Sequence, residues 1–394
     1  MANLFWLCIG TILYVYAGYP ALLTLLARLS PPKPVGYTSQ LPTVTLLIAA
    51  YNEAAVIAQK LENSLALNYP SERLQILVTA DGSKDDTPAI VNQFSERGVE
   101  LCYEPQRRGK MAAINRAIPY VRGQIVIFSD ANNLYDGDAL QHLVAPFADP
   151  HVGAVSGAKV ILKGDGALGN SEGLYWKYES YIKKQETHLG SCTGVAGEIF
   201  AIRRELFEAP PDQIINDDFY MAMRLIRCGH RVVYAPQARS YERVSLTAQD
   251  EVARRARIVA GRYQAMSLAG ELLPWQQPFI TWQIISHKYS RPLLPLAMIG
   301  ALLANMWVVV RPDKGQSLRR LATPFNWLAL IGQLIFYGAA WLGGRQKNGK
   351  IGKLLYIPYF LVNSNMAALI GLYRFFTGKQ TTLWQRVSRR QDDS

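Results

Sequence analysis

The segment Thr43–Ala50, which reads TVTLLIAA, decides the fold, and the polar run Tyr51-Asn52-Glu53 follows it directly. The segment is apolar and rich in β-branched residues, and Pro42 precedes it, so it predicts a buried strand. The stretch Glu53–Leu67 then carries Ala, Ile and Leu at helical spacing. A strand followed by a helix is the unit from which parallel sheets are built.

The same alternation continues along the chain to residue 129. Alternation of this kind predicts an α/β domain with a mostly parallel sheet and helices on both faces. The further predicted strands are Leu74–Ala80, Val99–Tyr103 and Gln124–Ser129, and the further predicted helices are Asp85–Arg97 and Lys110–Val121.

Polar residues come directly after three of the predicted strands. They are Tyr51-Asn52-Glu53, Asp81-Gly82-Ser83 and Asp130-Ala131-Asn132-Asn133. In open parallel sheets the ligand binds outside the carboxyl ends of the strands, so these side chains are expected at one edge. Such an edge suits a nucleotide whose diphosphate is bound to a metal, because hard cations prefer oxygen ligands.

Each of these motifs also has a purely structural interpretation. Asp81-Gly82-Ser83 can be a turn, with Asp85 or Asp86 capping the next helix, and Asn52-Glu53 can simply start a helix. Asp130 can likewise be a cap. The sequence around Gly109-Lys110 lacks the other residues of a P-loop. The functional interpretation is favoured because the three motifs fall at the same edge.

Both ends of the chain are strongly apolar. No charged residue occurs from Leu4 to Ala27, which is long enough to cross a hydrocarbon core. A cleaved signal peptide is the alternative, but it would need a basic leading region and a shorter apolar stretch. Three further uncharged runs that predict membrane spans are Pro292–Val310, Leu321–Gly344 and Leu354–Tyr373.

Basic residues beside these runs predict their orientation. Arg28 and Lys33 follow the first span, which favours a cytoplasmic location for the central region. Three later spans would then place the C-terminus outside, whereas its basic residues favour the inside. These basic residues are Arg374, Lys379, Arg386, Arg389 and Arg390. The conflict leaves open a re-entrant or interfacial late segment, and Leu272–Tyr289 is a candidate surface helix.

The chain therefore divides into five predicted parts, and it is expected in the inner or plasma membrane as a multi-pass protein. The parts are an N-terminal transmembrane helix at 1–30, a cytoplasmic α/β domain at 31–270, an interfacial segment at 271–290, about three transmembrane segments at 291–376, and a basic tail at 377–394.

The charge and the cysteine content indicate which class of partner and which compartment to expect. The 394 residues carry a net charge of +12, but much of the excess lies beside the apolar runs, where anionic lipid headgroups are the expected partner rather than nucleic acid. The four cysteines have neither metal-ligand spacing nor a disulfide pattern, which favours a reducing compartment.

Together these motifs resemble the family-2 inverting glycosyltransferases, a family that includes cellulose, hyaluronan and poly-N-acetylglucosamine synthases. The resemblance runs from Thr43 to about Gln264 and implies a GT-A type fold. It implies that Tyr51, Asn52 and Glu53 form the first nucleotide motif and Asp81 the second, with Glu53 and Asp81 contacting base and ribose. Lys110, within the basic segment Arg107–Lys110, would lie near the donor.

The family's D-x-D motif corresponds to Asp130-Ala131-Asn132, where Asn replaces the second Asp. The resemblance implies a Mg²⁺ or Mn²⁺ site at Asp130 and Asn132. An amide oxygen can still bind such an ion, but a neutral ligand replaces a charged one. We therefore expect a weaker metal affinity.

The run Asn216-Asp217-Asp218 stands where the family has its T-E-D or E-D-D motif. By that match Asp218 is the catalytic base and Asp217 its neighbour. The alternative is that Asn216 caps a helix whose positive end favours both carboxylates. Upstream, Gly194 and Gly197 lie in a loop of small residues that resembles the family's acceptor-side loop.

Arg254-Arg255-Ala256-Arg257-Ile258 stands in the place of the Q-x-x-R-W motif, and only Arg257 is retained. The resemblance implies that Arg257 steadies the diphosphate leaving group, that Arg254 lies on the donor side and that Ile258 faces the acceptor. Because Ile258 replaces an aromatic residue, long processive polymerisation is not favoured. The alternative for Arg254 and Arg257 is a charged helix surface.

The function implied is single displacement with inversion, from a nucleotide-sugar donor to a lipid-linked or glycan acceptor at the membrane. By resemblance the donor is a UDP-sugar, although the sequence itself does not distinguish uridine from guanosine. Two alternatives stay open. One is a processive synthase that also extrudes its polymer, and the other is a catalytically silent membrane scaffold.

Overall fold

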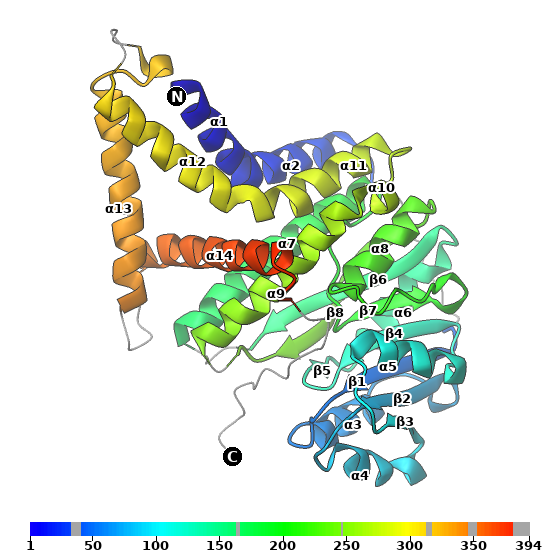
Figure 1. The fold of residues 1–394 in the computed structure, drawn as a ribbon. Coiled ribbons are helices and arrows are strands. Elements are labelled where there is room, and N and C mark those ends of the chain that lie inside the picture. Colours follow the sequence, from blue (N-terminus) through cyan, green and yellow to red (C-terminus); the bar gives the residue numbers. More distant parts are fainter. Residues whose placement is uncertain (33–40, 163–165, 246, 313–316, 346–352, 381–394) are drawn as a thin grey trace.

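The computed structural model describes residues 1–32, 41–162, 166–245, 247–312, 317–345 and 353–380. Lys33 and the basic residues after 380 therefore lie outside the described residues. In Figure 1 a twisted sheet with covering helices forms one part of the molecule, and long apolar helices lie beside it.

The central sheet has eight strands in the order β3-β2-β1-β4-β7-β6-β8-β5. The four strands predicted from the sequence are all present and pair in parallel, and antiparallel pairs join at β7 and β5. The sheet is therefore mixed and mostly parallel, as predicted. The bounds are β1 Val44–Ala50, β2 Leu74–Asp81, β3 Val99–Glu104, β4 Ile125–Asp130, β5 Leu134–Tyr135, β6 Val152–Ile161, β7 Phe200–Arg203 and β8 Arg231–Glu242.

Strand β1 shows why a strand at the centre of the sheet has a continuous run of apolar residues in its sequence. Leu46 and Ile48 belong to one buried cluster, and Leu47 belongs to another on the opposite face. A strand covered by helices on both faces needs apolar residues at every position. The covering helices are α3 Ile57–Leu65, α4 Thr87–Asn92, α5 Lys110–Ala117, α6 Ala139–Val144 and α8 Asp217–Arg227.

Two of the predicted helices are shorter than expected. Helix α3 begins at Ile57 rather than at Glu53, because Asn52 has a φ of 53° and the chain turns before it becomes helical. The predicted helix Asp85–Arg97 is α4 followed by a separate 3₁₀ turn at Ser95–Arg97. Both differences leave polar residues in loops at the sheet edge.

In the described parts of the chain, four helical segments are long and apolar enough to cross a membrane, in agreement with the sequence prediction. The first, Ala2–Leu29, comprises α1 Ala2–Leu13, a π-helical turn at Tyr14–Gly18 and α2 Tyr19–Leu29. The second, Pro278–Val310, comprises α11 Pro278–Ile284, a π-helical turn at Ile285–Tyr289 and α12 Ser290–Val310. The others are α13 Phe325–Arg345 and α14 Lys353–Phe376.

The predicted surface helix at 271–290 has a different arrangement. Its second half is continuous with α12, so the helix runs from the sheet domain into the apolar group without a break. Its first half contains the end of α10 Ala269–Leu272. Buried residues in the π-helical turn include His287 and Lys288, which a surface helix would expose.

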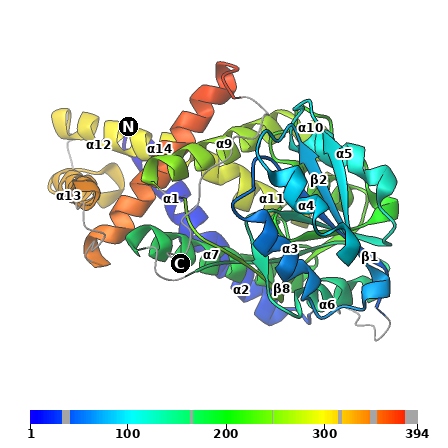
Figure 2. The ribbon, with the colours of Figure 1, turned by 90° about the horizontal axis from the view of Figure 1, so that it is seen from below.

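Two further long helices, α7 Gly166–Leu189 and α9 Ala248–Ser267, connect the sheet domain to the apolar helices (Figure 2). Helix α2 lies along α7, where the Tyr19 hydroxyl donates to Glu186 at 2.6 Å. Helix α14 packs on α9 so closely that a Cβ on Gly371 would lie 2.7 Å from the Ala256 carbonyl oxygen. Of the late segments, α14 is thus the one whose contacts fit the interfacial alternative.

Candidate active site

The loop after β1 is fixed by the loop after β2. The Asn52 side-chain oxygen accepts a hydrogen bond from the Lys84 backbone N–H at 2.9 Å, and the Asn52 N–H donates to the Ser83 hydroxyl at 3.1 Å. These bonds hold Tyr51 and Glu53 in place at the carboxyl end of β1. Asn52 therefore orders the edge, and Glu53 is buried beside it.

Asp81 fixes the basic segment that the sequence places near the donor. One of its carboxylate oxygens accepts from the backbone N–H groups of Arg108 and Gly109, at 2.9 and 2.7 Å. The next residue, Gly82, has a φ of 66°, and a Cβ there would lie 2.5 Å from that of Arg107. Only glycine fits this close approach, so Asp81 and Gly82 together set the path of the loop.

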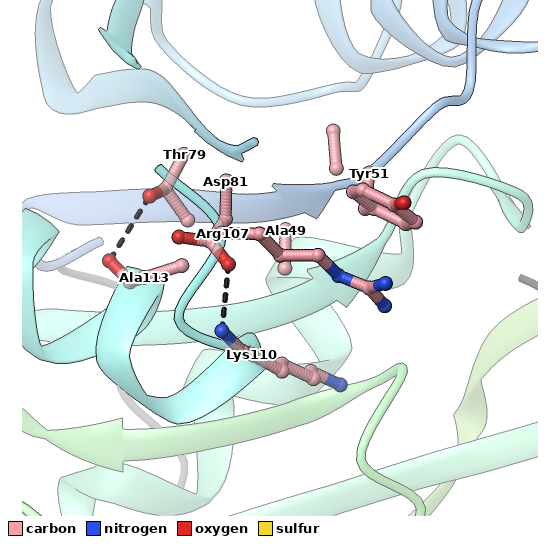
Figure 3. Close-up of a pocket in the computed structure, with 9 residues that line it drawn as sticks. Ala49, Tyr51, Thr79, Asp81, Arg107, Lys110 and Ala113 are labelled. Carbon is pink, nitrogen blue, oxygen red and sulfur yellow. Dashed lines mark hydrogen bonds between the residues drawn. The ribbon is translucent and has the colours of Figure 1, made fainter. Parts of the chain in front are cut away.

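Arg107 covers the ring of Tyr51, with its guanidinium carbon 3.7 Å from the ring centre. Figure 3 shows this pair at one end of a small hollow, with Asp81 and Thr79 at the other. A flat cation over a flat ring forms a stacked surface of the kind that a nucleobase can extend. The structure thus brings the two predicted nucleotide motifs together.

Lys110 and Asp130 meet across the sheet edge. The Lys110 ammonium donates to one Asp130 carboxylate oxygen at 2.7 Å. Burial opposes the charged form of Lys110, but Asp130, Asp217 and Asp218 raise its pKa above the usual range. Three carboxylates from two segments, the end of β4 and the start of α8, therefore act on one ammonium group.

Asn132 has the features of a metal ligand. Its side-chain oxygen is buried and has no hydrogen-bond partner among the described residues, and it faces the same cavity as Asp130. Such an oxygen suits a hard cation. No group of three or more His, Cys, Asp or Glu side chains in the described parts of the chain could hold a metal ion. The residues present therefore fit an ion shared with a phosphate-bearing ligand.

Asp217 and Asp218 begin α8, as the sequence predicts. The Asn216 side chain does not cap this helix, because its amide donates to the Ile258 carbonyl oxygen at 2.8 Å. The capping interpretation of Asn216 is therefore wrong. Asp218 instead accepts a hydrogen bond from the Phe219 N–H at 2.7 Å.

The surroundings of Asp218 shift its pKa in the direction that suits a base. Burial raises the pKa of Asp218, and the neighbouring Asp217 carboxylate raises it further. Arg262, the Phe219 N–H and Lys110 act in the opposite direction. An aspartate with a raised pKa accepts a proton more readily near neutral pH than an ordinary surface aspartate does.

Sequence reasoning missed Arg262. Its guanidinium carbon lies 3.8 Å from the centre of the Phe219 ring, and burial lowers its pKa while Asp218 raises it. The available signal was helical spacing, because Arg254, Ile258 and Arg262 share one face of α9. What the spacing does not reveal is that this face covers the start of α8.

The two predicted arginines of α9 have different environments. Arg254 binds Glu251 at 2.6 Å and Glu172 at 3.4 Å, which ties α9 to α7. Arg257 faces the cavity, and among the described residues it has no hydrogen-bond or ion-pair partner. Arg257 is therefore the one available to an anionic ligand, whereas Arg254 has a structural part in holding the helices together.

The acceptor-side loop passes close to Asp218. A Cβ on Gly197 would lie 3.1 Å from an Asp218 carboxylate oxygen, and one on Gly194 would lie 2.6 Å from the Lys288 ammonium. A larger residue at either position would therefore displace one of these two side chains. Ile258 faces the same space from α9.

Most of these groups line one cavity of about 940 Å³, whereas Tyr51, Asp81 and Arg107 line the separate small hollow of Figure 3. The cavity is lined by Glu53, Lys110 and Asp130 at the sheet edge, by Asp218, and by residues of α7, α9, α12 and α14. Its lining also includes the apolar side chains of Leu294, Ile357 and Leu361. A single space therefore connects the carboxyl ends of the strands to the apolar helices.

Comparison with solved structures supports the fold. A mannosyltransferase from Pyrobaculum calidifontis, solved with GDP-Man and Mn²⁺, has a TM-score of 0.70 and 23% sequence identity, over 95% of this chain and 99% of that one. Together with the sheet and its polar edge, this likeness places the structure among GT-A glycosyltransferase folds.

Sequence comparison identifies the family of one domain within the chain. Residues 45–209 match the model of glycosyl transferase family 2, so this part of the chain is a domain of that family, as the resemblance implied. The chain is 27% identical to a beta-monoglucosyldiacylglycerol synthase of Synechocystis over 76% of its own length and 64% of the relative's. It is 30% identical to a poly-beta-1,6-N-acetyl-D-glucosamine synthase of Staphylococcus aureus over 52% and 51%. The chain therefore spans only about half to two thirds of these relatives.

Proposed function

We propose that this chain is a membrane-anchored glycosyltransferase that moves a sugar, with inversion, from a nucleotide-diphosphate donor to an acceptor presented at the bilayer. The observation that carries the proposal is the continuous cavity from the Asp130 edge, past Asp218, to the apolar helices. The names of the relatives support it, because they are synthases of a glycolipid and of a polysaccharide.

In this reaction the donor's base and ribose lie by Tyr51, Glu53 and Asp81, and its diphosphate lies between Lys110 and Arg257. Both cations stabilise the negative charge that develops on the leaving group. Asp130 and Asn132 would hold a divalent ion, Mg²⁺ or Mn²⁺, which neutralises the diphosphate when bound. The solved mannosyltransferase holds Mn²⁺ and GDP-Man, so a GDP-sugar joins a UDP-sugar as a candidate donor.

Asp218 takes the proton from the acceptor hydroxyl as that oxygen attacks the anomeric carbon. The bond from the anomeric carbon to the diphosphate oxygen breaks on the opposite side, and its electron pair leaves with the nucleoside diphosphate. Gly194 and Gly197 leave room for the acceptor beside Asp218. The catalytic domain would lie on the cytoplasmic side of the inner or plasma membrane, where nucleotide sugars are made.

The test is a donor screen with the full chain in a nonionic detergent. UDP- and GDP-sugars are supplied with Mg²⁺ or Mn²⁺, and the release of nucleoside diphosphate is measured. We expect turnover with at least one donor and none with Asp218→Asn. If no donor is turned over, the protein is not acting as this enzyme and the scaffold alternative gains support. If Asp218→Asn matches an active parent, Asp218 is not the base.

A further inference from the structure

Lys183 is a buried lysine without an ionic partner. Its side chain is only 2% exposed, and it lines the cavity from α7. Among the described residues it has no hydrogen-bond or ion-pair partner, and its ammonium lies over the rings of Tyr234 and Trp176, at 5.0 and 5.6 Å from their centres. An unpaired ammonium in such a place is costly unless a ligand neutralises it.

Other donors without partners line the same cavity. The Trp176 indole N–H is buried and has no partner within the described residues. The Arg291 guanidinium binds Glu179 through one nitrogen, while two others are buried without an acceptor in the described structure. The cavity here thus holds several N–H groups that have nothing to donate to.

The nearby carboxylates are engaged elsewhere. Glu179 binds Lys288 at 3.1 Å and also Arg291, and these partners lower its pKa against the effect of burial. Glu186 accepts from Tyr19 at 2.6 Å and from the Thr193 N–H at 2.7 Å. Glu198 and Glu242 likewise pair with Lys159, so Lys183 stays without a carboxylate partner among the described residues.

The position of Lys183 relative to the base suggests what it binds. Its Cε would lie 3.7 Å from a Cβ on Gly194, and a Cβ on Gly197 would lie 3.1 Å from Asp218. Gly194 and Gly197 are three residues apart, a stretch of chain that spans at most about 11 Å, so Lys183 and Asp218 lie beside the same short loop. Beyond Lys183 the cavity reaches the apolar residues of α12 and α14, where acyl or prenyl chains would fit.

We propose that Lys183, with Trp176 and Arg291, forms a subsite for the phosphate ester of an anionic lipid, whose headgroup extends toward Asp218. This inference rests on the proposed function, since it names the class of acceptor for the same site. Sugar hydroxyls alone would leave the Lys183 charge unmatched, whereas a phosphate oxygen accepts charge-assisted hydrogen bonds from all three donors.

The test measures binding rather than turnover, with the full chain in nonionic detergent and calorimetric titration of mixed micelles. Phosphatidylglycerol is compared with uncharged diacylglycerol, and glycerol phosphate and inorganic phosphate serve as headgroup probes without tails. We expect the parent to bind phosphatidylglycerol at least about tenfold more tightly than diacylglycerol. Glycerol phosphate or inorganic phosphate binding as tightly as the lipid would overturn the lipid assignment.

Lys183→Gln should remove the preference for phosphatidylglycerol and leave nucleotide-sugar affinity unchanged. The matched control is Lys184→Gln, because Lys184 is the next residue on the same helix and is exposed. A preference that survives Lys183→Gln, or that Lys184→Gln weakens equally, would refute the subsite. If Lys183→Gln fails to fold, Lys183→Arg should keep the preference and Trp176→Phe should weaken it, and the opposite results would count against the subsite.

Failure of the two proposals can be told apart. If the chain prefers phosphatidylglycerol through Lys183 but turns over no nucleotide sugar, the lipid subsite is supported and the enzymatic activity is refuted. If the chain turns over donor but binds both lipids equally, the activity is supported and the lipid subsite is refuted.

Discussion

The two ends of the cavity are built by different means. At the donor end, short loops after β1, β2 and β3 are joined by hydrogen bonds between side chains and backbone groups, as Asp81 is to the N–H groups of Arg108 and Gly109. At the membrane end, buried side chains of α2, α7 and the π-helical turn bond to one another, as Tyr19, Glu186 and His287 do. Local turn chemistry thus fixes the first end, and long-range ionic contacts fix the second.

This difference suggests that one end of the cavity binds the donor and the other binds the acceptor. The donor end depends on loops whose shape follows from a few residues next to the strands, which suits a ligand common to many transferases. The membrane end depends on side chains drawn from helices far apart in sequence, so it can vary without disturbing the donor site. Substitutions should therefore separate effects on the donor from effects on the acceptor.

The largest expected effect is at the donor end. Asp130→Ala should reduce transfer to background and weaken donor binding, because it removes the carboxylate of the proposed metal site and leaves Lys110 without that partner. Excess chelator should have the same effect on the parent, and added Mg²⁺ or Mn²⁺ should reverse it. Full turnover in chelator would show that the reaction needs no divalent ion.

Asp218→Asn should separate chemistry from binding at the boundary between the two ends. It keeps the side-chain shape and removes the proton acceptor, so transfer should fall by about 10²- to 10⁴-fold while nucleotide-sugar affinity survives. Transfer rate, donor affinity by calorimetry and melting temperature should be measured together. If the rate of sugar transfer stays near that of the parent, Asp218 is not the base and Asp217 becomes the candidate.

Asp217→Asn should have a milder effect that depends on pH. The Asp217 carboxylate raises the pKa of Asp218, so removing its charge lowers that pKa. Asp218 then stays ionised at lower pH, and the acidic limb of the rate profile moves to lower pH. Asp212→Asn is the control, since Asp212 is exposed and lies in the same segment. An unmoved acidic limb would mean that Asp218 does not control it.

Ile258→Trp should give the smallest effect, and it should fall on the acceptor side. The side chain faces the cavity beside the acceptor loop, so the KM for the acceptor should change by more than the KM for the donor. Ile258→Leu conserves volume and serves as the control, and the melting temperature must be checked because a larger side chain can strain the packing. Equal changes in both KM values would place Ile258 elsewhere.

The sequence predicted the donor end well because its signals are local. The strand positions, the polar residues after them and the start of α8 at Asp217 follow from hydrophobic period and turn chemistry. The roles of Asp81 and Arg254 are less visible, because only the fold shows that Asp81 binds the Arg108 and Gly109 backbone and that Arg254 is held by Glu251 and Glu172.

The membrane end could not be predicted, because its contacts join residues far apart in the chain. Nothing near Lys183 in the sequence indicates that it is buried, and Lys184 beside it looks equivalent. The π-helical turn at Ile285–Tyr289 gives no sequence signal either, yet it carries His287 and Lys288 into the protein interior. These placements depend on how α7 packs against the apolar helices.

The buried cluster around Glu179 and Glu186 bears on how the polypeptide matures during synthesis. Both glutamates belong to α7, but their partners His287, Lys288 and Arg291 lie about a hundred residues later in the chain, in the apolar helical segment Pro278–Val310. Before that segment has been translated, the two carboxylates lack these cations, and burying them without the cations is costly. We therefore expect α7 to complete its packing only after that segment has been made. A version cut before Pro278 should expose this surface and aggregate.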